Sequence, residues 1–306
     1  MPIKTISLTS IEDFISVLRP SSSHWNGNIR DWIFRGQRDA NWHLVPTAFR
    51  PDTAMSFKYH NIRGIAIHKR EQFENELNLL LDFVEMADSL ALNIPGDSYL
   101  IRTSRGMDDI QISFRNDSWP SWELHEIIAI AQHHGVPTRF LDFSRNGFKA
   151  AFFAAAEGYK HFNNNPTSAD NICVWAINRK MLLLGIPTAL QRIGVVTVPR
   201  VDNEYLHAQE GLFLYDCWAN REFGTTAFSV NLEDIVLKLQ EFRKRQLNPY
   251  TQDIIYKITL PIESSKLLLR ELDSENINEA FLMPTFDKVV STLRFNRDVF
   301  NTMFIR

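Results

Sequence analysis

The strongest hydrophobic pattern in the chain is a helical repeat between residues 71 and 91. Apolar side chains recur there at alternating steps of four and three residues, at Phe73, Leu77, Leu80, Val84, Ala87 and Ala91. This spacing puts them on one side of an amphipathic helix. Related patterns predict helices over 122–134, 147–159, 179–184, 231–246 and 264–272, and a short helix that carries Ile11, Phe14, Val17 and Leu18 behind a cap at Thr9 or Ser10.

Short apolar or alternating runs between these helices predict strands. They cover 32–34, 139–144, 172–177, 195–198, 211–215, 225–230 and 253–260. The polar segment 93–120 is expected to be an exposed loop. We therefore expect an α+β fold in which helices pack against a mixed central sheet.

A run of polar residues interrupts the apolar pattern between the helix that ends near residue 134 and the aromatic and alanine-rich helix 147–159. It consists of Gln132, His133, His134, Thr138, Arg139, Asp142 and Ser144. Burial of such groups without partners is costly. They must therefore satisfy one another or line a cavity that is open to a ligand.

Further polar residues stand beside two other predicted strands, at Arg35-Gly36-Gln37 and at Gln209-Glu210. A glycine after Arg35 permits a close approach or an unusual backbone angle, as is needed to aim a guanidinium into a crevice. The alternative is a buried structural ion pair at Arg35. If these groups converge with the 132–144 residues, they would bind an anionic or nucleotide-like ligand; otherwise they form a polar network that specifies the fold.

Composition narrows the classes of function. The 306 residues carry a net charge of −3 with a pI near 6.3, so no global electrostatic attraction to nucleic acid or acidic membranes is expected, although a local basic groove is not excluded. Two cysteines, Cys173 and Cys217, are too few for a disulfide framework or a cysteine zinc cluster. With no signal peptide or membrane span in the pattern, a cytoplasmic protein is expected.

Several familiar catalytic motifs are absent from the sequence. Ala129 replaces the second histidine of a metalloprotease motif that would begin at His125-Glu126, and there is no Walker loop, Gly-rich dinucleotide turn or GxSxG elbow. The adjacent His133 and His134 point in different directions on a helix end, so we expect no metal site.

Four blocks in the chain resemble the FRG domain family, which is named for a Phe-Arg-Gly motif. They are Phe34-Arg35-Gly36 followed by Gln37, Trp42 and Pro46; AQHHGVPTRFLDFS with the FKAAFFA helix; AQEGLF around Gln209; and INEAFLMPTFDKV. They occur in the family's order between about Ser10 and about Leu293. The chain departs from the family at Phe143, where Trp is usual, at Phe140, where Leu is frequent, and at Glu210, where a second Gln is common.

The resemblance implies a single domain over residues 1–306 with a helical insertion at approximately 51–120. It also implies a bacterial or phage-associated protein, with members suspected of roles in conflict systems such as toxins or phage defence. A weaker fold-level analogy connects the pattern to ADP-ribosyltransferases. In that analogy the catalytic positions are Arg35, Ser144 and Glu210.

Two functions are left open by this resemblance. In the first, an enzyme cleaves NAD as an ADP-ribosyltransferase or glycohydrolase: Arg35 holds the pyrophosphate or ribose, Ser144 supports the binding loop, and Glu210 stabilises the oxocarbenium ion. In the second, a non-catalytic sensor module recognises a nucleotide, a protein or a nucleic acid. The ligand-binding residues expected in either case are Phe34, Gly36, Gln37, Gln132, His133, Thr138, Arg139, Asp142 and Gln209.

Overall fold

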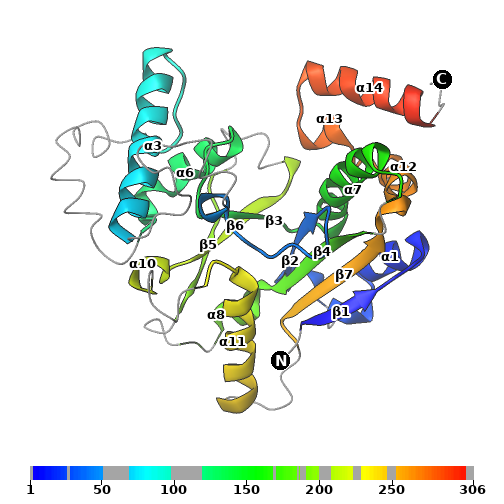
Figure 1. The fold of residues 1–306 in the computed structure, drawn as a ribbon, viewed down its shortest axis with the longest axis horizontal. Helices are drawn as coiled ribbons and strands as arrows, with labels where there is room; N and C mark the ends of the chain where they lie inside the picture. The colour runs from blue at the N-terminus through cyan, green and yellow to red at the C-terminus, as the bar shows by residue number, and fades with distance from the viewer. Residues whose placement is uncertain are drawn as a thin grey trace.

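A computed structural model describes residues 3–25, 28–50, 69–97, 119–167, 170–184, 186, 191–199, 208–222, 229–246 and 253–300. Within these residues seven strands form one sheet in the order β1-β7-β4-β2-β3-β6-β5 (Figure 1). β1 pairs with β7 in parallel, and the other neighbours pair antiparallel. The strands are β1 (Lys4–Ser7), β2 (Trp32–Gln37), β3 (Leu141–Ser144), β4 (Asn171–Asn178), β5 (Ile193–Val196), β6 (Gly211–Asp216) and β7 (Ile255–Pro261).

The predicted helices are all present among the described residues, and the α+β fold with a mixed central sheet is confirmed. The first helix is capped by Ser10, whose hydroxyl accepts a hydrogen bond from the Asp13 amide. No described helix is both long and apolar enough to cross a membrane. The α-helices are α1 (Ile11–Leu18), α3 (Lys69–Ser89), α6 (His125–His133), α7 (Gly147–Asn164), α8 (Arg179–Leu183), α10 (Ala219–Glu222), α11 (Leu232–Gln246), α12 (Ser265–Ser274), α13 (Glu279–Leu282) and α14 (Phe286–Phe300).

Three details differ from the sequence expectation. Strand β2 continues through Arg35, Gly36 and Gln37, which the pattern placed at its end, because these residues pair with Trp175, Val174 and Cys173 of β4. Residues 98–118 of the expected exposed loop 93–120 lie outside the described residues, and near its two ends Ile94 and Trp119 are buried and pack with α3. Most of the predicted strand 225–230 lies outside the described residues, and positions 229 and 230 are not in a strand.

Successive side chains of each strand point to opposite faces of the sheet, and in the central strands most of them are apolar. Helices therefore cover both faces. Phe34, Val174 and Ala176 point to a core that is shared with α1, α7 and α12. Their neighbours Ile33, Trp175 and Ile177 point to the opposite core, against α11. A third core lies beyond β6, where α3 and α6 pack together. The two central strands, β2 and β3, thus run beneath the N-terminal half of α7.

Gly36 allows α7 to approach the sheet at close range. A Cβ atom at this position would lie 1.9 Å from the carbonyl oxygen of Ala150 and 2.8 Å from the amide nitrogen of Ala154. Both are backbone atoms of α7, so neither can move aside without a shift of the helix. Gly36 has no positive φ. The glycine of the FRG block is therefore required by helix packing and not by an unusual backbone angle.

We expect Gly36→Ala to lower the free energy of unfolding by about 1–3 kcal/mol, since overpacking against backbone forces the helix outward. Chemical denaturation followed by circular dichroism measures the change. Gly147→Ala is the matched control, because its added Cβ would first meet the flexible Leu18 side chain, at 3.2 Å. Equal stability of the wild type and Gly36→Ala would contradict the close-packing argument.

Candidate functional site

The two central strands diverge beneath α7. Strand β2 pairs with β3 only at Phe34 and Ser144, whereas it pairs with β4 along its whole length. A cavity of about 210 Å³ lies where β2 and β3 separate. It is lined by Phe34, Arg35, Gly36, Asp142, Phe143, Ser144, Ala150, Phe153, Glu157 and Gln209.

Arg35 bridges the gap between the diverging strands. Its Nη1 donates to the main-chain oxygen of Asp142 at 2.8 Å and lies 3.4 Å from the carboxylate oxygen Oδ2 of the same residue. The Arg35 Nε is buried and has no hydrogen-bond partner among the described residues. The guanidinium therefore takes the place of main-chain hydrogen bonds between β2 and β3. Its Nε–H remains without a hydrogen-bond partner among the described residues.

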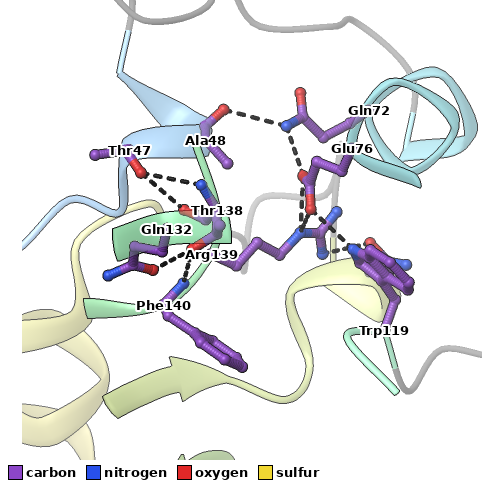
Figure 2. Close-up of polar contacts among 10 residues, drawn as sticks. Thr47, Ala48, Gln72, Glu76, Trp119, Gln132, Thr138, Arg139 and Phe140 are labelled. Atoms are coloured by element: carbon purple, nitrogen blue, oxygen red, sulfur yellow. Dashed lines mark hydrogen bonds and ion pairs between the residues drawn. The ribbon is translucent and has the colours of Figure 1, made fainter. Parts of the chain in front are cut away.

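Asp142 is held from its other side by a chain of hydrogen bonds. Gln132 Nε2 donates to Asp142 Oδ1 at 2.5 Å, and Gln132 Oε1 accepts from the Thr138 hydroxyl. Thr138 in turn accepts from the Phe140 amide and is tied by its backbone to Thr47 (Figure 2). The carboxylate is thus oriented between a fixed amide and a fixed guanidinium while its side chain stays 60% exposed.

Ser144 holds the opposite wall of the cavity. Its hydroxyl donates to the main-chain oxygen of Gln209 at 2.7 Å and accepts from the Asn146 amide at 3.0 Å. The Gln209 side chain donates to the main-chain oxygen of Leu282 at 3.4 Å. The donated bond therefore fixes the turn before β6, and the accepted bond fixes the turn that leads from β3 into α7.

Glu210 does not line the cavity. Its carboxylate Oε1 lies 2.8 Å from the Lys149 ammonium on α7, and its backbone has a positive φ of 51°. The main-chain oxygen of Glu210 accepts from the Arg145 amide. Of the three positions that the analogy makes catalytic, the structure brings Arg35 and Ser144 to the cavity and places the Glu210 carboxylate in an ion pair outside it.

Arg139 also lies away from the cavity, in a buried cluster that joins α3 to the chain before β3. Its Nε lies 2.9 and 2.7 Å from the two carboxylate oxygens of Glu76, and its Nη1 donates to Asn220 at 2.6 Å (Figure 2). Gln72 and Trp119 donate to the same Glu76 carboxylate. Arg139 is only 2% exposed. This arrangement braces the helical segment α3 and leaves no path from Arg139 to a ligand in the cavity.

Four other residues expected to bind ligand also lie outside the lining: Gln37, Gln132, His133 and Thr138. Gln37 is buried and bonded at both ends, to the Trp175 indole at 2.7 Å and to the main-chain oxygen of His43 at 3.2 Å. Thr138 reaches the site only through Gln132. Partial burial and the neighbouring His134 lower the pKa of His133, while Asp142 acts to raise it. Among the described residues no group of three or more His, Cys, Asp or Glu side chains is arranged to hold a metal ion.

Four residues of the lining were not expected from the sequence. Phe143, Ala150, Phe153 and Glu157 were treated as strand and helix packing. Phe153 and Glu157 are four residues apart on α7, and this spacing on the side of the helix that overlies Gly36 is the signal that could have identified them. Glu157 is exposed. With Asp142 it makes two carboxylates at the cavity against one guanidinium.

Comparison with known proteins identifies the family of the central segment. The FRG domain model matches residues 100–163. The chain contains an FRG domain. The match includes Gln132, Asp142, Ser144 and nearly all of α7, and it does not extend to the Phe34-Arg35-Gly36 block or to Gln209. No curated protein and no solved structure matches the chain.

The structural role of the Arg139–Glu76 pair can be tested by substitution. We expect Arg139→Met to destabilise the protein by about 3–5 kcal/mol, because it leaves the Glu76 carboxylate buried without its counter-charge. The double variant Arg139→Met/Glu76→Gln should lose less than the sum of the two single variants, since it removes both charges. Denaturant titrations of all four proteins measure this coupling. Strict additivity would contradict it.

Proposed function

We propose that the FRG domain of this chain binds a nucleotide-like small molecule between β2 and β3, and that oxidised NAD enters this cavity by its nicotinamide end. The observation that carries the proposal is the composition of the lining. The partly buried Phe153 stands beside the Asp142 and Glu157 carboxylates and the guanidinium of Arg35, whose Nε has no hydrogen-bond partner among the described residues. Few convergent polar groups in an aromatic-lined hollow are typical of small-molecule sites.

Charge favours a cationic ring over a phosphate in this cavity. Arg35 is already paired with Asp142, and Glu157 adds a second negative charge. The nicotinamide ring of oxidised NAD is positively charged, so it is attracted both by the carboxylates and by the ring of Phe153, which is only partly buried. A pyrophosphate placed beside the same carboxylates would be repelled. The phosphates of the ligand therefore lie outside the cavity in this proposal.

The volume of the cavity also favours the entry of a single ring. Drug-sized ligands occupy clefts of roughly 300–1,000 Å³, and the cavity has about 210 Å³. It accommodates one ring with part of its sugar and not a whole dinucleotide. Arg35 Nε and the Gln209 side chain are the groups available to hydrogen-bond the carboxamide or the ribose.

A second function, cleavage of the bond between nicotinamide and ribose, is favoured by the same two carboxylates. A negative charge held close to an oxocarbenium ion lowers the barrier to its formation. The residues for this role are Asp142 or Glu157, because the Glu210 carboxylate is paired with Lys149 outside the cavity. NAD consumption would agree with the toxin or phage-defence role that the FRG resemblance implies.

The charge argument predicts that oxidised NAD stabilises the purified protein against heat more than reduced NAD does, because the reduced ring is neutral. Asp142→Asn and Glu157→Gln should each weaken the binding of oxidised NAD by about 1.5–3 kcal/mol, the range for a charge-assisted contact. Glu12→Gln, on the distant helix α1, is the matched control. Thermal shift and calorimetry measure these differences. Equal stabilisation by both forms of NAD, or by neither, would refute the proposal.

Analysis of the ligand after incubation distinguishes the two functions. Release of free nicotinamide, measured by chromatography and mass spectrometry, would establish cleavage. Recovery of intact NAD would leave a binding or sensor module whose output passes to a protein or nucleic-acid partner. Glu210→Gln decides which acid acts: retained cleavage assigns the role to Asp142 or Glu157, and lost cleavage returns it to Glu210.

A further inference from the structure

Helix α14 is attached to the body of the protein largely by polar side chains. Asn296 is 4% exposed and donates to Asp273 of α12 at 3.1 Å, while the Thr292 hydroxyl accepts from the Ala280 amide of α13. Ser291 and Lys288 both donate to Glu279 of α13 at 2.6 Å. These contacts form one continuous side of α14, which therefore turns much of its polar surface inward.

The opposite side of α14 is apolar and exposed. Phe286 is 91% exposed, and Val289, Val290 and Leu293 are 43–47% exposed. Their spacing of three, four and seven residues places them in one stripe over two helical turns. Arg297, one turn further on, is exposed and ends the stripe. A surface helix normally buries such a stripe, so its outward orientation indicates an interaction surface.

We propose that a second copy of this chain covers the stripe, with the two α14 helices packed antiparallel across a two-fold axis. The stripe is self-complementary about a point midway between Val289 and Val290. Reversal of the helix about that point sets Phe286 on the partner's Leu293, and Val289 on the partner's Val290. The largest side chain, Phe286, then meets the smaller Leu293, and the two valines pack against each other at the centre.

Charges beside the stripe match the same arrangement. Asp287 and Arg294 are exposed, and neither forms an ion pair with another described residue. They are seven residues apart and so lie on the same flank of the stripe. In an antiparallel pair centred between Val289 and Val290 this flank meets itself in reverse. Asp287 then lies about 3 Å along the helix axis from the level of the partner's Arg294, an offset that the long arginine side chain spans. Opposite charges thus face each other twice across the axis.

The surface is separate from the cavity. In Figure 1 α14 lies at the edge of the molecule beyond α13, while β2 and β3 run through the centre. The proposed dimer therefore does not depend on any ligand of the FRG domain, and either proposal can fail without the other.

Analytical ultracentrifugation of the full chain over a wide range of concentrations tests the dimer. The wild type should associate to a dimer, and Val290→Asp should be monomeric under the same conditions. Met86→Asp is the matched control, because Met86 is 64% exposed on α3, on the other side of the molecule. Circular dichroism and thermal unfolding verify that each variant folds. A wild type that stays monomeric, or a dimer that Val290→Asp does not disturb, would overturn the proposal.

A charge exchange tests the antiparallel register. Asp287→Arg alone places like charges opposite each other at both symmetric contacts and should raise the dissociation constant at least about tenfold. Arg294→Asp alone should do the same. The double variant Asp287→Arg/Arg294→Asp restores both pairs and should return the dissociation constant close to that of the wild type. Failure of the double variant to recover association, when both single variants have weakened it, would exclude this register.

Discussion

The contact between α7 and the backbone of β2 at Gly36 is the constraint on which the centre of this protein depends. A side chain at position 36 would collide with backbone atoms of Ala150 and Ala154, so the helix reaches this depth only over a glycine. Because α7 lies so close at this point, its following turn carries Phe153 and Glu157 over the gap between β2 and β3. The cavity is therefore a consequence of how one helix packs on one strand.

Polar groups hold that gap open in a defined shape. Strands that diverge leave main-chain donors and acceptors without ladder partners, and such groups must find others. Arg35 supplies one by donating to the main-chain oxygen of Asp142, and Ser144 supplies another by donating to that of Gln209. The same side chains that satisfy the backbone are thus the ones that line the cavity. Because each of these side chains both stabilises the backbone and lines the cavity, its structural role cannot easily be separated from a role in binding.

The buried cluster around Arg139 has a different purpose. Glu76 receives hydrogen bonds from α3 itself, from Trp119 and from Arg139, and so fixes α3 against the segment that leads into β3. On either side of Arg139 in the sequence, Gln132, Thr138 and Asp142 form the chain of bonds that ends in the cavity. The polar residues between 132 and 144 thus have two roles: Arg139 holds α3 in place, and Gln132 and Thr138 position Asp142 at the cavity.

The sequence by itself determined most of the secondary structure of this protein, because helical and strand periodicities are local properties of the chain. It did not predict strand β1, which forms by pairing with the remote β7. The repeat in α3 and the cap at Ser10 can be recognised without any long-range contact. It also singled out Arg35, Asp142, Ser144 and Gln209 as candidates for one site, but left open whether they would meet. It could not separate them from Arg139, Gln37 and Glu210, which are equally polar and adjacent in sequence.

Only the tertiary structure decided which polar residues face the cavity. That choice depends on where each side chain meets a partner more than about sixty residues away, such as Glu76 for Arg139 and Lys149 for Glu210. The outward turn of the apolar stripe on α14 was decided in the same way. The polar side of α14 forms hydrogen bonds with α12 and α13. The sequence of the helix alone does not show which of its sides packs against the rest of the protein.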